Sequence, residues 1–377
     1  MTKSIDPRRK WRRLHEWPAA YRVAWEAATA PGDDLDQPNY GRSLQPASLA
    51  TISRNFGRFI SFLDGGGELD DQVPLAEYVT PARIAGYLRE LQTMTYAPQS
   101  ITLALSAISC TMRILAPERD WHWIWAPNGI SLAPYLKGRR KELAVPHPSN
   151  LYSWGLKLME TAQTKTRARD RLAQYRDGLI ICMLAGRAPR KRSFAAMRLG
   201  EHLFKNGQDW RLKFEPADVK NRRWIETSLP QSLTPWLDRY VNEILPALLE
   251  RRCKRRNVLP HQGDSQSVWL STDGSALTAD SLTGVLWNRS GRKFATPFAT
   301  HRFRHAIGTH APADDPEHPG LATGLLAISG AMHQKHYNRA QNHIAETRYN
   351  EALREERAKS LALARRLLAE RRGKTSE

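Results

Sequence analysis

The sequence is poor in cysteine and has no long apolar run. Its 377 residues include only three cysteines, Cys110, Cys182 and Cys253, which lie far apart in the chain. This odd and scattered set argues against a disulfide framework and against a zinc site. The longest apolar stretch, around residues 179–186, is well short of the ~18 residues that a membrane span needs. The basic N-terminus lacks the apolar region of a secretory signal, so we expect a reducing compartment.

Acidic residues are also scarce. The chain has 38 acidic residues against 57 lysines and arginines, which gives a formal net charge of +19. This excess suggests a polyanionic partner, and nucleic acid fits better than a membrane because no amphipathic anchor accompanies the charge. Basic residues cluster in separate segments, at 8–13, 137–141 and 251–256, which suits a protein that wraps a duplex. We therefore expect a protein of the bacterial cytoplasm that is associated with the nucleoid and binds double-stranded DNA.

Helical periodicity dominates the first third of the chain. Apolar residues recur at helical spacing over residues 46–63, 81–91 and 101–115, and a shorter helix is expected near 17–28. The segment 121–125 (Trp-His-Trp-Ile-Trp) is predicted to be extended, with three indoles on one side against a packed domain edge. These elements together predict a small all-α domain.

The second half mixes helices with strands. Residues 209–214 and 224–229 are predicted to be strands, joined through a turn at 218–221, because apolar and polar residues alternate in the second of them. Helices are expected at 172–185, from Thr234 with a kink at Pro246, after Thr278 and from Thr300.

These patterns predict two domains flanked by a basic arm and a helical tail. The predicted segments are a basic N-terminal arm at 1–44, a helical DNA-binding domain at 45–135, a basic linker at 136–149, a mixed domain at 150–350 and a C-terminal helix at 351–377. The linker carries Arg139, Arg140 and Lys141, which we expect to lie along the DNA backbone.

Five residues of the second half suit a single chemistry: Arg190, Lys220, His301, Arg304 and Tyr337. A free tyrosine, with a pKa near ~10, is a poor nucleophile at neutral pH unless surrounding cations stabilise its phenolate. Guanidinium forks match the non-bridging oxygens of a phosphodiester under attack. A histidine can accept the tyrosine proton, and a lysine on a turn can protonate the leaving 5′ oxygen. The set therefore predicts DNA cleavage by a tyrosine.

The surroundings of these residues resemble the tyrosine recombinases, the phage-integrase family, over about residues 45–350. Residues 190–199 (RKRSFAAMRL) resemble the family's first-arginine box, and Lys220 sits where the family has its mobile lysine. Residues 300–305 (THRFRH) contain its His-x-x-Arg motif, and residues 335–340 (KHYNRA) resemble the nucleophile segment.

The resemblance implies a mainly α fold with a small antiparallel β-sheet. A helical core-binding (SAM-like) domain and an α+β catalytic domain would form a C-shaped clamp around DNA. The reaction implied is cleavage and rejoining through a 3′-phosphotyrosyl link, without metal or cofactor, for integration, excision or transposition of a mobile element. Four protomers would act together, alone or with sister recombinases. The C-terminal helix would either exchange between protomers or pack on its own domain. Arg192 and Arg302 are further expected DNA contacts.

The sequence departs from the family's pattern at two positions. Ser193 stands where the family often has a glutamate, so the orienting role of that glutamate is lost or supplied elsewhere. Ile328 occupies the slot of a histidine or tryptophan nine residues before the tyrosine. Either His333 or His336 substitutes for that residue, or an insertion around residues 312–319 shifts the register. These departures keep two other functions open, a catalytically weak or silent DNA-binding accessory and a type IB topoisomerase-like enzyme.

Rival assignments also stay open for two of the five residues. Arg187 and Arg192 compete with Arg190 as the first arginine, and Tyr349 competes with Tyr337 as the nucleophile.

Overall fold

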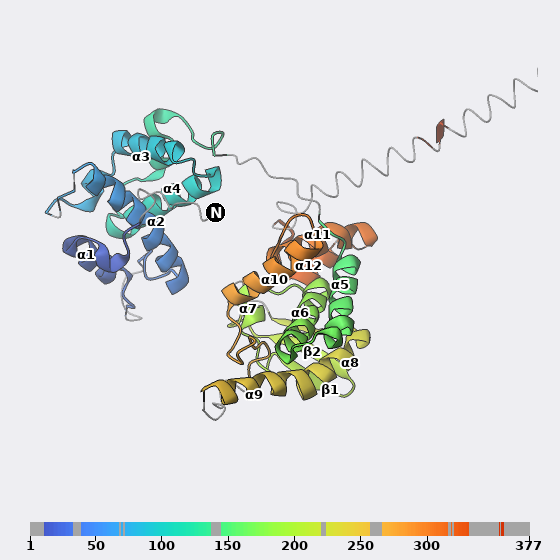
Figure 1. Ribbon diagram of the computed structural model, residues 1–377. Coiled ribbons are helices and arrows are strands. Elements are labelled where there is room, and N and C mark those ends of the chain that lie inside the picture. The colour runs from blue at the N-terminus through green and yellow to red at the C-terminus, as the bar shows by residue number, and fades with distance from the viewer. Residues whose placement is uncertain are drawn as a thin grey trace, which may run out of the picture. The chain divides into compact units, whose positions relative to one another are not determined.

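The computed structural model describes residues 11–32, 39–67, 69–70, 72–136, 145–219, 224–256, 266–315, 318, 320–331, 354 and 356–357. The chain divides into two compact units, Met1–Glu142 and Leu143–Glu377 (Figure 1), each with its own hydrophobic core. Among the described residues, every helix is too short or too polar to cross a membrane.

Helices build the described part of the first unit. The α-helices are α1 (Ala19–Thr29), α2 (Pro46–Gly65), α3 (Pro81–Thr93) and α4 (Pro98–Leu115). The last three begin with proline, whose fixed φ suits a first helical turn and whose missing N–H costs nothing there. The Thr80 hydroxyl caps α3 by accepting a hydrogen bond from the Arg83 backbone N–H at 3.3 Å. All the helices predicted for this region are confirmed.

The beginning of the chain packs into this core. Trp17, Tyr21 and Trp25 are buried, and the Trp17 ring lies 5.4 Å from that of Phe56 on α2. The Tyr21 hydroxyl donates to the carbonyl of Val73 at 2.9 Å. Residues 17–29, which the sequence pattern assigned to a separate arm, therefore belong to the first unit, because their large aromatic side chains gain more from burial than from solvent exposure.

The tryptophan-rich segment is helical and not extended. Residues His122–Trp125 form a 3₁₀ helix, so the predicted extended strand is wrong. The Trp121 indole N–H donates to the Ala116 carbonyl at 2.8 Å, which anchors a buried ring at the end of α4. The local conformation is set by this hydrogen bond from the indole N–H to the backbone, and not by the spacing of the indoles.

The second unit surrounds a small sheet with helices. Its helices are α5 (Pro148–Glu160), α6 (Ala168–Gly186), α7 (Lys191–Ala195), α8 (Thr234–Arg239), α9 (Leu245–Arg256), α10 (Ala279–Lys293), α11 (Thr300–Asp314) and α12 (Leu321–Leu326). Its strands are β1 (Leu203–Asn206), β2 (Asp209–Phe214) and β3 (Ile225–Ser228), antiparallel in the order β1-β2-β3. Arg211 pairs with Phe204 on one side and with Ser228 on the other. The two predicted strands are confirmed, and β1 was missed.

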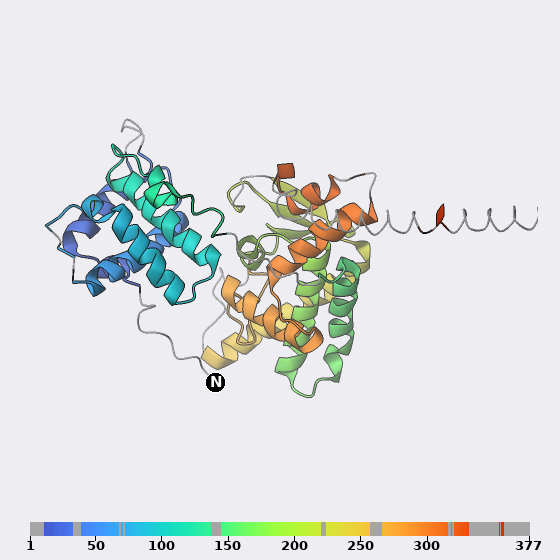
Figure 2. The same cartoon turned by 90° about the horizontal axis from the view of Figure 1, so that it is seen from above.

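Helix α6 is the centre of this unit. It packs against α5, α10 and α11 (Figures 1 and 2), and every residue from Gln174 to Ala185 is buried. Its buried charges are paired: the Arg176 guanidinium donates to Asp177, and Arg289 of α10 reaches the same carboxylate at 2.8 Å. A helix covered all round is a rigid support for the residues that follow it.

The long helix predicted from Thr234 contains an irregular turn. A π-helical segment, Tyr240–Ile244, joins α8 to α9 directly before Pro246. Proline cannot donate to the carbonyl four residues earlier and its ring crowds that carbonyl, so a wider turn at this point accommodates it. The predicted disturbance is present, and it takes the form of a π turn.

The contact between α5 and α6 depends on two glycines. A Cβ atom at Gly178 would lie 2.6 Å from the Gly155 carbonyl oxygen, which is backbone and cannot move aside. We expect Gly178→Ala to lower the free energy of unfolding by about 1–3 kcal/mol, as overpacked cores do. Gly284→Ala in α10 is the matched control, since nothing lies within 4 Å of its added methyl, and helix propensity should make it neutral or stabilising. Equal melting temperatures for both variants would contradict the close packing.

Cys182 should be the inert thiol of the three. It is buried on α6, and burial raises its pKa to about 12, so the thiol stays protonated at pH 8. Cys110 and Cys253 are partly exposed. A maleimide reagent at pH 8 should therefore modify the folded protein rapidly at two positions and at the third only after denaturation. Rapid modification of all three in the folded state would show that α6 is accessible.

Candidate active site

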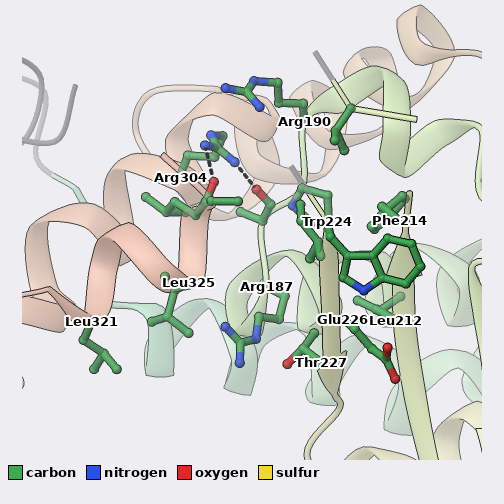
Figure 3. Close-up of a pocket in the computed structure, with 17 residues that line it drawn as sticks. Arg187, Arg190, Leu212, Phe214, Trp224, Glu226, Thr227, Arg304, Leu321 and Leu325 are labelled. Atoms are coloured by element: carbon green, nitrogen blue, oxygen red, sulfur yellow. Dashed lines mark hydrogen bonds between the residues drawn. The ribbon is translucent and has the colours of Figure 1, made fainter. Parts of the chain in front are cut away.

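A cavity of about 420 Å³ opens between the sheet and the last described helices of the second unit. Its walls come from residues 187–190, which link α6 to α7, from β2 and β3, and from α11 and α12 (Figure 3). Arg190 and Arg304, 114 positions apart in the sequence, both line it. The fold thus brings two of the five predicted residues to one place.

Arg304 is buried and held by two backbone carbonyls. It lies on α11 between Phe303 and Ala306, which pack into the core. One of its terminal nitrogens donates to the Ala188 carbonyl at 2.5 Å and the other to the Leu326 carbonyl at 3.0 Å (Figure 3). The guanidinium plane is therefore fixed before any ligand binds.

Arg190 precedes α7 and is half-buried. Its backbone is extended, with φ −64° and ψ 144°, and it occupies the N-cap position of this helix. Arg190 and the fixed Arg304 together give one end of the cavity a cationic character.

The two rival arginines occupy different surroundings. Arg187 lines the same cavity, and its side chain points away from Arg190 and Arg304 toward Thr227 (Figure 3). Burial lowers the pKa of Arg187, because its charged guanidinium is partly removed from water. Among the described residues, no acidic side chain pairs with it. Arg192 is exposed on α7. The geometry therefore favours Arg190 as the partner of Arg304.

His301 lies outside the cavity wall. It is exposed in the first turn of α11, and its ring stands 4.6 Å from that of His305, edge to face. This contact agrees with the predicted shared face of positions four apart. Arg302, an expected DNA contact, is half-buried and burial lowers its pKa.

Several predicted residues lie outside the described part of the chain. They are Lys220 and Tyr337 of the catalytic set, the linker residues Arg139, Arg140 and Lys141, and the alternatives His333, His336 and Tyr349. Their roles stay predictions.

Ile328 brings no polar group to the site. Its side chain is buried in the core of the second unit, directly after Ala327, which has left-handed backbone geometry with φ 48°. Ala327 ends α12, and the carbonyl of the residue before it is the one that Arg304 binds. The turn at Ala327 thus leaves the Leu326 carbonyl within hydrogen-bond distance of Arg304. Ile328 packs into the core directly after this turn.

Trp224 is a wall residue that the sequence pattern did not single out. Its side chain is 54% exposed although it lines the cavity, and the Lys213 ammonium lies 4.9 Å from its ring centre. The sequence held one indication of this exposure: Trp224 begins the alternating strand in register with the polar residues Glu226 and Ser228.

Metal ligands are not assembled here. Among the residues that the structure describes, no three histidine, cysteine or acidic side chains come together in a way that could hold a metal ion.

Similarity to known proteins is found in solved structures. No family model and no curated protein sequence matches the chain. The integrase of the transposon Tn1549, solved in complex with transposon right-end DNA, is similar with a TM-score of 0.50 and 13% identity, over 82% of this chain and 95% of that one. The XerH site-specific recombinase bound to its difH substrate gives a TM-score of 0.49 and 12% identity, over 89% and 94% of the two chains. The chain shares the fold of this integrase, which confirms the predicted mainly α fold with a small antiparallel β-sheet.

The carbonyl contacts of Arg304 make a testable statement about stability. Arg304→Ala leaves the buried carbonyls of Ala188 and Leu326 without these donors. At about 1–3 kcal/mol for each unsatisfied group, the variant should lose about 2–6 kcal/mol of unfolding free energy. The exposed Arg192 gives the matched control, since Arg192→Ala should change stability by less than about 0.5 kcal/mol. Calorimetric melting of both variants decides this, and equal melting temperatures would show that the two carbonyl bonds contribute nothing.

Proposed function

We propose that the protein is a site-specific DNA recombinase that cleaves and rejoins DNA through a 3′-phosphotyrosyl intermediate. The observation that carries this proposal is the convergence of Arg190 and Arg304 on one cavity in a chain with the fold of a transposon integrase. The net charge of +19 supports DNA as the partner, as does the DNA bound in the related integrase structure.

In the proposed reaction Tyr337 attacks the scissile phosphorus. The bond from phosphorus to the 5′ oxygen breaks, and the 3′ phosphate becomes linked to the tyrosine. Arg190 and Arg304 stabilise the charge on the non-bridging oxygens, and His301 accepts the tyrosine proton. Lys220 gives a proton to the departing 5′ oxygen. Because the covalent link keeps the energy of the broken bond, rejoining is the reverse reaction with a 5′ hydroxyl of another strand.

The fixed orientation of Arg304 fits this role. A donor held by the protein before the substrate arrives needs no reorganisation in the transition state. Removing one such group typically costs about 100- to 1000-fold in rate. The exchange of strands needs two duplexes, so we propose four protomers on DNA, either of this chain alone or with a sister recombinase.

A second candidate function follows from Ile328. Its apolar side chain is buried at the position where the family has a histidine or tryptophan, so a polar contributor to catalysis is missing from that slot. A DNA-binding accessory protein without cleavage activity would tolerate this replacement.

Covalent capture of DNA separates the two functions. Duplexes from the ends of the mobile element that carries the gene, nicked near candidate crossover points, release a short fragment on cleavage and trap the adduct. We expect a protein–DNA adduct on denaturing gels with the wild type and none with Tyr337→Phe, which removes only the attacking oxygen.

Other outcomes of this experiment are equally informative. If both proteins bind the DNA and neither forms an adduct, the accessory function gains support. An adduct of equal yield with Tyr337→Phe would transfer the nucleophile to another residue, with Tyr349→Phe as the next variant. Relaxation of plasmids that lack any special site would favour a topoisomerase-like activity.

A further inference from the structure

Two large apolar side chains are exposed at the cavity that Arg190 and Arg304 share. Trp224, which precedes β3, is 54% exposed, and Leu321, the first residue of α12, is exposed as well. Both line the cavity. Leaving such side chains in water costs free energy that burial would recover. A pair of them at one concave site therefore indicates a surface that a ligand covers.

The indole of Trp224 is held on one face. The Lys213 ammonium of β2 lies 4.9 Å from the ring centre, and it also pairs with the Glu215 carboxylate at 3.1 Å. A cation over one face of an indole restricts the rotation of the ring and leaves the opposite face for a ligand. Figure 3 shows the indole on the sheet side of the cavity, with Leu321 and Leu325 contributed by α12. Trp224 thus offers a flat apolar surface that is ordered before a ligand binds.

The cavity combines this surface with a cationic end. Arg190 and Arg304 line the same cavity, and two backbone carbonyls fix the Arg304 guanidinium. Guanidinium groups match a phosphate, and aromatic rings stack on a nucleobase. The volume of about 420 Å³ lies in the range of pockets that take small organic ligands. The charge and shape of the cavity therefore suit a nucleotide whose base has left the duplex.

Strand exchange supplies such a base. Before a cut strand can be joined to a strand of another duplex, the nucleotides at the cut have to leave their pairing partners. Unpairing and unstacking a base costs free energy. An aromatic side chain that stacks on the released base recovers part of this cost, whatever the base, because every base has a π-face.

We propose that Trp224 stacks on an unpaired base next to the phosphate that Arg190 and Arg304 bind, and that it thereby stabilises the opened DNA through which strands are exchanged. This inference rests on the proposed function. It assigns the two arginines to the phosphate of one nucleotide and the indole to its base.

Binding of duplexes that contain one unpaired base tests the proposal. Duplexes from the ends of the mobile element carry a single mismatched pair, which is moved in steps of one position across the candidate crossover points. In a parallel series, one nucleotide of the mismatched pair is replaced by an abasic nucleotide, which keeps the phosphate and removes the base. Fluorescence anisotropy of the end-labelled duplexes gives the dissociation constant for each position.

We expect the wild type to bind the mismatched duplex more tightly than the abasic duplex at a position beside the scissile phosphate. Trp224→Ala should weaken binding of this mismatched duplex by about 5- to 150-fold, the contribution of one stacked base. Its binding of the abasic duplex should hardly change, because no base is present to stack. Trp224→Phe keeps a smaller aromatic face and should lie between the wild type and Trp224→Ala.

Trp287 provides the matched control. It lies on α10, is 53% exposed and does not line the cavity. Trp287→Ala should therefore change the binding of the mismatched and the abasic duplex by the same factor. Melting temperatures measured for all variants show whether a loss of binding comes from unfolding.

The outcomes separate the stacking role from the reaction itself. If Trp224→Ala weakens both duplexes equally, or weakens neither, the stacking role is overturned, while covalent capture of DNA decides the proposed function independently. If the wild type forms no covalent adduct but Trp224→Ala shows the base-dependent loss, the proposed function fails and the base-binding role of Trp224 stands. A wild type that binds none of the duplexes would overturn both.

Discussion

The contact on which the candidate site depends is the pair of hydrogen bonds from Arg304 to the carbonyls of Ala188 and Leu326. It joins α11, the segment after α6 and the end of α12, which are remote in the sequence. A guanidinium can do this because its donors lie in one plane at fixed angles. The bonds that satisfy two buried carbonyls also orient the arginine toward the cavity. Arg304 therefore contributes both to the stability of the fold and to the proposed chemistry.

Much of the fold was predictable from local patterns. Apolar spacing located α2, α3 and α4, and Thr80 followed by proline located the start of α3. These signals are local and need no tertiary contacts. The 3₁₀ helix at His122–Trp125 and the burial of Trp17 were not predictable in this way, because each depends on a partner elsewhere in the chain. Strand β1 reads Leu-Phe-Lys-Asn, in which apolar and polar residues do not alternate.

The candidate site was predictable in its residue types and less so in its geometry. Motif spacing pointed to Arg190 and Arg304, which the fold brings to one cavity. The spacing favoured Arg190 and left Arg187 as a rival, and the direction of each side chain in the structure also separates the two. In the sequence, Ser193 stood where the family often has an orienting glutamate. In the structure its hydroxyl donates a hydrogen bond to the Asp218 carbonyl. The contacts of His202 could not be predicted from the sequence, because the role of a buried histidine depends on the groups packed around it.

The burial of α6 has a consequence for motion. Residues 174–185 of this helix are all buried, so we expect their backbone amides to exchange with solvent mainly when the whole unit unfolds. Residues 187–190 follow directly from this helix, so the backbone at the start of this segment is anchored to it. Arg187 and Arg190 of the cavity thus lie just after the most deeply buried stretch of α6. Local opening is expected first in elements that pack less deeply, such as the short helix α12.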